Sequence, residues 1–237
     1  MTGVGDSIEA DLGAWTFSDG VESKFDEHVK KSVIGYDLSQ KIITLLSDNF
    51  VHNCSTIIDL GCSTGSLTRS IYKRHQHKDI NIIGYDLEQG MIDKAISLSK
   101  KEGIEIDYQK ANIIDVEFPS NVDMIISAYT IQFVLPRTRQ LLINKIYETL
   151  DWGGGFFLFE KVRAPDARFQ DYINQAYMNF KLVNFSPDEI IKKSNSLSGV
   201  MEPFSSEGNL GLLKRAGFTD ICTVAKYLCF EGFLAIK

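Results

Sequence analysis

The chain has 237 residues and a formal net charge of −6 at neutral pH, with 44% hydrophobic and 24% charged residues. These are ordinary values for a globular protein that buries one sizeable core, so we expect a single domain spanning residues 1–237. An acidic chain disfavours a nucleic-acid partner, because gripping a phosphate backbone needs an extended basic surface. The basic clusters are short, and we interpret them as solvated helix faces: Lys30-Lys31, Lys73-Arg74 and Lys192-Lys193.

Other function classes are disfavoured by what the sequence lacks. No apolar run approaches the roughly 20 residues that cross a bilayer, and the acidic N-terminus has no export-signal pattern. We therefore expect a cytoplasmic protein with no membrane partner. The four cysteines have no C-x-x-C spacing and the four histidines form no ligand pattern. We expect free thiols and no metal site.

Strand and helix patterns alternate along the chain. A helical segment over residues 15–50 comes first. A core over residues 51–162 follows, with strands predicted at 56–60, 81–86, 105–110, 122–128 and 155–160 and helices at 67–73, 89–101 and 137–150. Such alternation is typical of a doubly wound parallel sheet.

The last third of the chain follows a different pattern. Two strands, 219–225 and 228–236, are separated by a few residues and predict an antiparallel hairpin that closes the fold over residues 217–237. Residues 163–216 predict a helical cap insertion. Within it Phe169, Tyr172, Ile173, Ala176, Tyr177 and Phe180 recur at helical spacing. This stripe either packs on the core or, being aromatic and above the strand ends, contacts substrate or a second copy.

The fold class that these patterns predict is Rossmann-like α/β. We expect a seven-stranded, mostly parallel sheet with a C-terminal antiparallel hairpin, N-terminal helices and a helical cap.

A glycine-rich turn follows the first core strand, in the run Asp59-Leu60-Gly61-Cys62-Ser63-Thr64-Gly65, and the second strand ends in Asp86. Glycines let the backbone approach a ligand, and an acid at the second strand end suits ribose hydroxyls. An acid that opens the loop is unfavourable beside phosphates but favours a cation. The segment resembles motif I of class I S-adenosylmethionine-dependent methyltransferases. We expect S-adenosylmethionine as cofactor and S-adenosylhomocysteine as its product.

Ligands of open α/β sheets bind beyond the carboxyl ends of the strands, so each strand end predicts contacts. The cofactor contacts that we expect are Asp59, Gly61, Cys62, Ser63, Gly65, Asp86, Leu87, Met91, Asn112, Ile113 and Ala128. Capping of its own loop is the alternative role for Asn112, and core packing is the alternative for Tyr129. Tyr129, Glu160 and His28 are the candidates for a general base, although none stands in a diagnostic motif.

The N-terminal region and several later segments carry a closer resemblance. Taken together they resemble the carboxy-S-adenosylmethionine synthase family over nearly the whole chain: Trp15-Thr16-Phe17, Phe25-Asp26, His28, Gly35-Tyr36, Gln132-Phe133, Lys145-Ile146-Tyr147, Gly153-Gly154-Gly155, Glu160-Lys161 and Ala216-Gly217-Phe218. The resemblance implies an enzyme that makes carboxy-S-adenosylmethionine from S-adenosylmethionine and prephenate, for modification of the tRNA wobble uridine. It also implies a homodimer and a Tyr36 contact to the methionine end of the cofactor.

Two positions depart from that family. Counting back from Val200-Met201 puts Ser194 where the family has a carboxylate-binding arginine, and Ala128 stands where it has an asparagine. A serine cannot supply a bidentate cation for a carboxylate. We therefore expect methyl transfer to a small-molecule acceptor, in specialised metabolite biosynthesis. Trp15, Tyr129, Gln132, Tyr177 and Ser194 are the expected substrate contacts. Carboxy-S-adenosylmethionine synthesis is the alternative, and a non-catalytic cofactor-binding protein is a second one.

Overall fold

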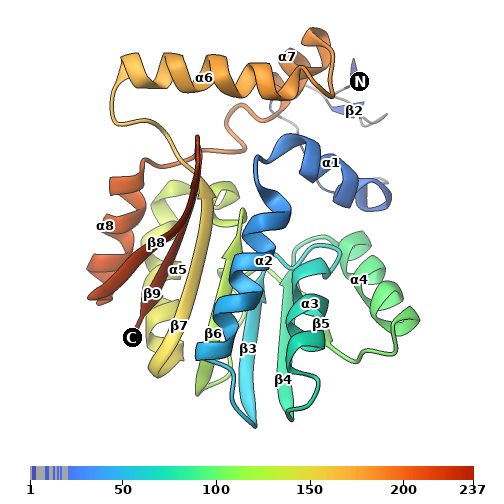
Figure 1. Cartoon of the computed structure of the whole chain (residues 1–237), viewed down its shortest axis with the longest axis vertical. Coiled ribbons are helices and arrows are strands. Elements are labelled where there is room, and N and C mark those ends of the chain that lie inside the picture. The colour runs from blue at the N-terminus through green and yellow to red at the C-terminus, as the bar shows by residue number, and fades with distance from the viewer. Residues whose placement is uncertain (1, 4–8, 11–12, 14, 16, 18–20) are drawn as a thin grey trace.

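Seven strands form one sheet in the order β5-β4-β3-β6-β7-β9-β8 (Figure 1). The computed structural model describes residues 2–3, 9–10, 13, 15, 17 and 21–237. The strands are β3 (Ser55–Leu60), β4 (Ile80–Asp86), β5 (Asp107–Lys110), β6 (Val122–Ala128), β7 (Leu150–Lys161), β8 (Asp220–Tyr227) and β9 (Phe230–Ile236). The first five run parallel, and β9 pairs antiparallel with both β7 and β8. The predicted fold class is confirmed.

Helices cover both faces of this sheet because its strands are apolar on both sides. Ile58 packs with side chains of α5 (Pro136–Thr149) and α8 (Ser206–Ala216). Ile57, which points to the opposite face, packs with α2 (Tyr36–Leu46) and α3 (Ser66–His75). Alternate residues of one strand thus serve two cores, and Asp59 faces the α2 side as Ile57 does.

The strand β7 starts earlier than the sequence predicts. A strand was expected from residue 155 and a helix through residue 150, but α5 ends at Thr149 and β7 begins at Leu150. Leu150 pairs with Val122, and the register is irregular before Gly155. A Cβ on Gly155 would lie 2.7 Å from the ring of Phe50. Gly155 admits that ring and lies inside the predicted strand. The residues that the prediction omits include Gly153 and Gly154, whose low strand propensity hides the start of β7.

The cap over the strand ends consists of α6 (Ala167–Lys181) and α7 (Pro187–Ser196), which lie at the same end of the sheet as α1 (Phe25–Ser32) (Figure 1). The helix α8, inside the predicted cap insertion, packs against α5 instead. Although α6 is fully described, it has no buried residue. Most of its aromatic stripe therefore stays off the core, and Tyr177 packs edge-on against Phe230 of β9, with ring centroids 5.6 Å apart.

A helical segment was expected over residues 15–50, and helices run from η1 (Val21–Ser23) through α1 and α2 to η2 (Ser47–Asn49). Trp15 and Phe17 are not helical, and residues 16 and 18–20 lie outside the described residues. Before these helices, β1 (Thr2–Gly3) and β2 (Glu9–Ala10) form a short antiparallel pair. The helix α4 (Gln89–Lys101) follows β4. None of the helices in the described ranges combines the length and apolarity that crossing a membrane requires.

Candidate active site

A cavity of about 530 Å³ opens at the carboxyl ends of β3, β4 and β6, beneath α1 and the cap helices. Its wall brings together sixteen of the residues that the sequence singled out: Trp15, His28, Tyr36, Asp59, Gly61, Cys62, Ser63, Asp86, Leu87, Met91, Asn112, Ile113, Ala128, Tyr129, Gln132 and Tyr177. Three others, Gly65, Glu160 and Ser194, do not line it.

The turn after β3 brings backbone close to this cavity. The N–H groups of Gly61 and Cys62 both donate to the Tyr85 carbonyl, at 2.8 and 2.9 Å. Gly61 has φ +77°, and a Cβ there would lie 2.3 Å from Oγ1 of Thr130. Gly65 precedes α3 with φ +73° and shapes the turn without reaching the cavity. Position 61 accepts only glycine, because a side chain there would strain the backbone and collide with Thr130.

Asp59 presents a buried carboxyl group to the cavity. The residue is 2% exposed, and Oδ2 has no hydrogen-bond partner among the described residues. Burial, with a contribution from the charge of Asp86, raises the pKa of Asp59 to about 7. An unpartnered buried carboxylate oxygen on a cavity wall is a strong site for a cationic or hydrogen-donating ligand.

Asp86 fixes the other acidic corner of the cavity. Its Oδ2 accepts from the Ser63 N–H at 2.9 Å and its Oδ1 accepts from the Glu88 N–H at 3.0 Å. Burial raises the pKa of Asp86, and these two backbone donors act in the opposite direction. A carboxylate has about four acceptor sites, so both oxygens can still accept from the two hydroxyls of a ribose.

Tyr36 and Tyr129 lie together on the cavity wall, with ring centroids 6.0 Å apart. Tyr129 has φ +64°, a rare backbone state for a side chain of this size, and its hydroxyl pairs with Ser39 Oγ at 2.8 Å. Burial raises the pKa of Tyr129 to about 12 and raises that of Tyr36 as well. Both phenols are neutral at physiological pH, so they act as hydrogen-bonding groups and not as bases.

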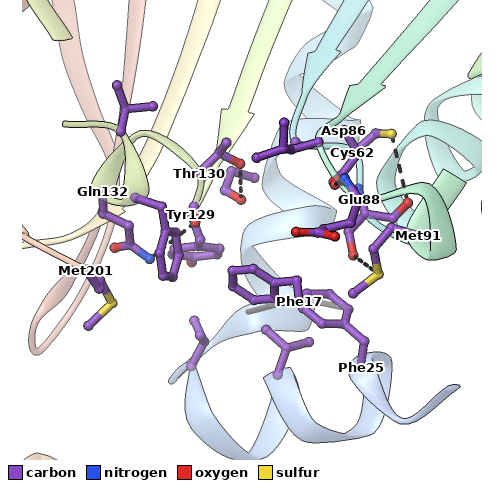
Figure 2. Close-up of a pocket in the computed structure, with 18 of the residues that line it drawn as sticks. Phe17, Phe25, Cys62, Asp86, Glu88, Met91, Tyr129, Thr130, Gln132 and Met201 are labelled. Carbon is purple, nitrogen blue, oxygen red and sulfur yellow. Dashed lines mark hydrogen bonds between the residues drawn. The ribbon is translucent and has the colours of Figure 1, made fainter. Parts of the chain in front are cut away.

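Figure 2 shows the cavity between these groups. Tyr129, Thr130 and Gln132 lie on one side, and Asp86 and Met91 lie on the other. The rings of Phe17 and Phe25 close the side toward α1 (Figure 2). The cavity is therefore acidic at the strand ends and aromatic at its cover, which suits a cation that carries a planar ring system.

His28 is enclosed by the cap. It is 3% exposed, its ring stacks on Trp15 with centroids 6.2 Å apart, and Lys193 Nζ is hydrogen-bonded to its Nε2. A charged lysine can only donate, so Nε2 acts as the acceptor. As a candidate base, His28 is already engaged by a neighbouring ammonium group.

Glu160 is buried and does not line the cavity. Its Oε1 accepts from the Ile131 N–H at 3.0 Å, and burial raises its pKa to about 8. It therefore fixes η3 (Ile131–Phe133), the turn that carries Gln132. Gln132 in turn donates to the Tyr129 carbonyl at 3.2 Å and accepts from the Lys161 N–H at 3.0 Å. In the structure Glu160 is a positioning group for the loop.

The amide of Asn112 caps its own turn, the alternative that the sequence left open. Its Nδ2 donates to Asp115 at 2.6 Å and its Oδ1 accepts from the Ile114 N–H at 3.1 Å. Asn112 and Ile113 both line the cavity, so this turn can still contact a ligand there.

Two lysines on the wall were missed by the sequence interpretation. Lys161 ends β7, and the strand-end rule that selected Ala128 would also have selected it. Lys193 was assigned to a solvated helix face, but it lies half-buried over the Trp15 ring at 4.4 Å and lines the cavity. Within the described ranges, no group of three or more His, Cys, Asp or Glu side chains is arranged to hold a metal.

These residues fit S-adenosylmethionine, since the unpartnered Asp59 oxygen, the Asp86 corner and the aromatic cover match its cationic, ribose and adenine parts. The fold and site define an S-adenosylmethionine-dependent enzyme of the class I methyltransferase type. Residues 57–154 match the family model described as a methyltransferase domain. Among solved structures, the S-adenosylmethionine-dependent methyltransferase SibL superposes with a TM-score of 0.65 and 16% identity, over 97% of this chain and 63% of that one. Phosphoethanolamine N-methyltransferase 2 of Haemonchus contortus, bound to S-adenosylmethionine, gives 0.57 and 16%, over 83% and 52%.

A closer relative comes from sequence. Carboxy-S-adenosyl-L-methionine synthase of Campylobacter lari is 34% identical over 222 residues, which cover 93% of this chain and 94% of that protein. The chain belongs to the carboxy-S-adenosylmethionine synthase family.

Proposed function

We propose that this protein synthesises carboxy-S-adenosylmethionine from S-adenosylmethionine and prephenate. The observation that carries the proposal is the similarity of 34% identity along 93% of the chain to a relative of that name. Plain methyl transfer, which the Ser194 and Ala128 departures led us to expect, becomes the second candidate.

The charge on the cavity wall favours carboxylation of the cofactor over methyl transfer. Lys161 and Lys193 line the same cavity as the strand-end acids. Cations near a sulfonium repel it and weaken its binding, unless an anion lies between them. A carboxylate-bearing co-substrate or product supplies that anion, whereas a neutral methyl acceptor leaves the repulsion in place.

The balance of the reaction also fits the residues. One hydrogen of the sulfonium methyl group is replaced by a carboxylate, while prephenate loses its ring carboxyl and hydroxyl groups and becomes phenylpyruvate. The departing hydroxide and the methyl proton leave together as water, so no side chain has to act as the final base. This agrees with neutral Tyr129, with His28 held by Lys193, and with Glu160 outside the cavity wall. The chain holds and orients the reactants and excludes water.

The test is incubation with S-adenosylmethionine and prephenate, followed by mass spectrometry of both products. The proposal predicts a cofactor product heavier by one carboxylate, together with phenylpyruvate in equal amount. Recovery of unchanged cofactor and prephenate from folded, cofactor-binding protein would overturn it.

Methyl transfer is kept as the second candidate because Ser194 replaces a cationic side chain by a short hydroxyl. If that loss retuned the pocket, Ser194→Arg should raise the preference for the carboxylated over the ordinary cofactor. An unchanged ratio of the two dissociation constants would remove this argument for methyl transfer.

A homodimer is a further part of the proposal. The family resemblance implies one, and α6 exposes apolar side chains along its length, with Phe169 52% and Tyr172 61% accessible. Because α6 buries no residue in the single chain, covering it by a second copy would remove this apolar surface from water.

A further inference from the structure

A second cavity of about 360 Å³ lies beside the first, beyond Lys161 and Tyr177. Both cavities are lined by Ser32, Lys161, Tyr177, Lys193, Leu197 and Met201, so they share one wall. Ser194, absent from the first cavity, lines this one. We call it the basic pocket; its remaining lining residues are Arg163, Lys181, Ser198, Gly199 and Glu202.

Positive charge is concentrated in the basic pocket. Lys161 ends β7 and Arg163 lies two residues beyond it, Lys181 ends α6, and Lys193 lies on α7. Of the described residues that line the pocket, Glu202 alone carries a carboxylate. Among the described residues, Lys161, Arg163 and Lys181 form no ion pair with a carboxylate. Three elements distant in sequence thus converge on one hollow with an excess of cations.

The ring of Tyr177 contacts two of these cations, and the charge of Lys161 acts on Lys181. Lys161 Nζ lies 4.5 Å and Lys181 Nζ lies 4.6 Å from the centroid of its ring, and its hydroxyl donates to the Ser32 carbonyl at 2.7 Å. Two ammonium groups on one ring repel each other, and the ring offsets only part of that cost. An anion between them would relieve it.

We propose that the basic pocket binds the acid group of an organic anion, carboxylate or phosphate, whose reactive end reaches the cofactor cavity past Lys161 and Tyr177. The inference rests on the proposed function for the reaction, but the binding itself is measurable without turnover. It assigns the co-substrate to a class: acids with an anionic anchor at one end and the reacting group at the other.

The position of Ser194 supports this assignment. The side chain that the family resemblance would make an arginine faces the basic pocket, where Lys161, Arg163 and Lys181 come from other elements. The pocket therefore keeps its cationic character although residue 194 is a serine. Specificity for the anion then rests on β7 and α6 in this chain.

The test is calorimetric titration of the S-adenosylhomocysteine-bound protein with malonate, with inorganic phosphate and with neutral malonamide. Wild-type protein should bind one of the two anions saturably and malonamide not at all. Lys181→Gln and Arg163→Gln should each weaken that binding by about tenfold, the usual weight of a charged hydrogen bond. Arg168→Gln is the matched control, because Arg168 is exposed on α6 and lies outside both cavities.

Absence of saturable anion binding, or equal weakening by Arg168→Gln, would overturn the inference. Thermal melts check that each variant is folded. In turnover, Lys181→Gln should raise the KM for the acidic co-substrate and leave S-adenosylhomocysteine affinity unchanged. Anion binding without any carboxylated product would contradict the proposed reaction and leave the basic pocket established.

Discussion

Asp59 and Asp86 end neighbouring parallel strands and face one cavity, and the charge of Asp86 adds to the burial that raises the pKa of Asp59 to about 7. Two carboxylates this close oppose each other's ionisation in the free protein. A cation between them reverses that effect. The pair therefore links cofactor binding to pH.

Cofactor affinity should fall below pH 7. In the free protein Asp59 takes up a proton near pH 7, while a cationic ligand favours its ionised form, so binding releases that proton. The dissociation constant of S-adenosylmethionine should rise by up to about tenfold for each pH unit below 7. Calorimetry between pH 5.5 and 8 measures this dissociation constant. These values lie about 1.5 units below and 1 unit above the pKa of Asp59.

Asp59→Asn should bind weakly and without this pH dependence. Because the raised pKa makes ionised Asp59 a cost to folding that grows between its ordinary pKa of about 4 and about 7, the variant should not melt lower than wild type at pH 8. Asp220→Asn, an exposed acid on β8, is the control. A pH dependence that survives Asp59→Asn would assign it to another group.

Asp86→Ala should weaken binding of S-adenosylmethionine by about ten- to a hundredfold, because the ribose loses a charged acceptor worth about 1.5–3 kcal/mol. The Ser63 and Glu88 N–H groups also lose their acceptor, so the turn should loosen. Calorimetry gives the affinity. Wild-type affinity in the variant would remove Asp86 from the site.

Gly61→Ala should destabilise the protein and abolish cofactor binding. A Cβ would meet Thr130 Oγ1 at 2.3 Å, in a backbone state with φ +77°. Gly103→Ala is the control, since φ is +68° there but nothing lies within 4 Å. Urea unfolding should show a clearly larger loss for Gly61→Ala, partly restored by Thr130→Ala. Equal losses for both glycines would mean that strain alone matters.

The α6 face should carry the dimer. Sedimentation velocity of wild-type protein should give a dimer, and Phe169→Ser with Tyr172→Ser should shift it to monomer. Trp152→Ser, which changes an 88% exposed apolar residue of β7, should leave the dimer intact. A monomeric wild type, or a dimer indifferent to the α6 changes, would contradict the proposed dimer.

The KM for an acidic co-substrate should rise above pH 8. Burial and the neighbouring Lys161 lower the pKa of Lys181 to about 8, so the positive charge that attracts an anion is lost as pH rises through that value. Arg163, Lys193 and Glu202 are the other charged groups of the pocket. Lys181→Arg should move the rise to higher pH, and steady-state kinetics measures it.

The sheet was predictable from the sequence because its signals are local. Apolar runs that end in Asp59, Asp86 and Ala128 indicate where strands end, and parallel strands bring those ends to one edge of the sheet. The start of β7 was not predictable, because Gly153 and Gly154 interrupt the strand pattern and Leu150 joins β7 through its pairing with Val122, which is distant in sequence.

The cationic side of the site was missed for a similar reason. In the sequence Lys193 is one of two adjacent lysines, a pattern typical of a solvated helix face. In the structure its ammonium group lies over the Trp15 ring. Lys161 and Lys181, 20 residues apart in the sequence, come to the same tyrosine ring, that of Tyr177, only in the folded chain. A cluster of charges drawn from three elements has no recognisable pattern in the sequence of any one element. A glycine-rich turn is a local pattern and can be recognised.

The most direct measurement follows the methyl carbon. With S-adenosylmethionine labelled by ¹³C in its methyl group and with prephenate present, NMR should find the label still bonded to sulfur, as a methylene next to a new carboxylate. Label found on a separate acceptor, with S-adenosylhomocysteine formed in equal amount, would contradict carboxylation and establish methyl transfer.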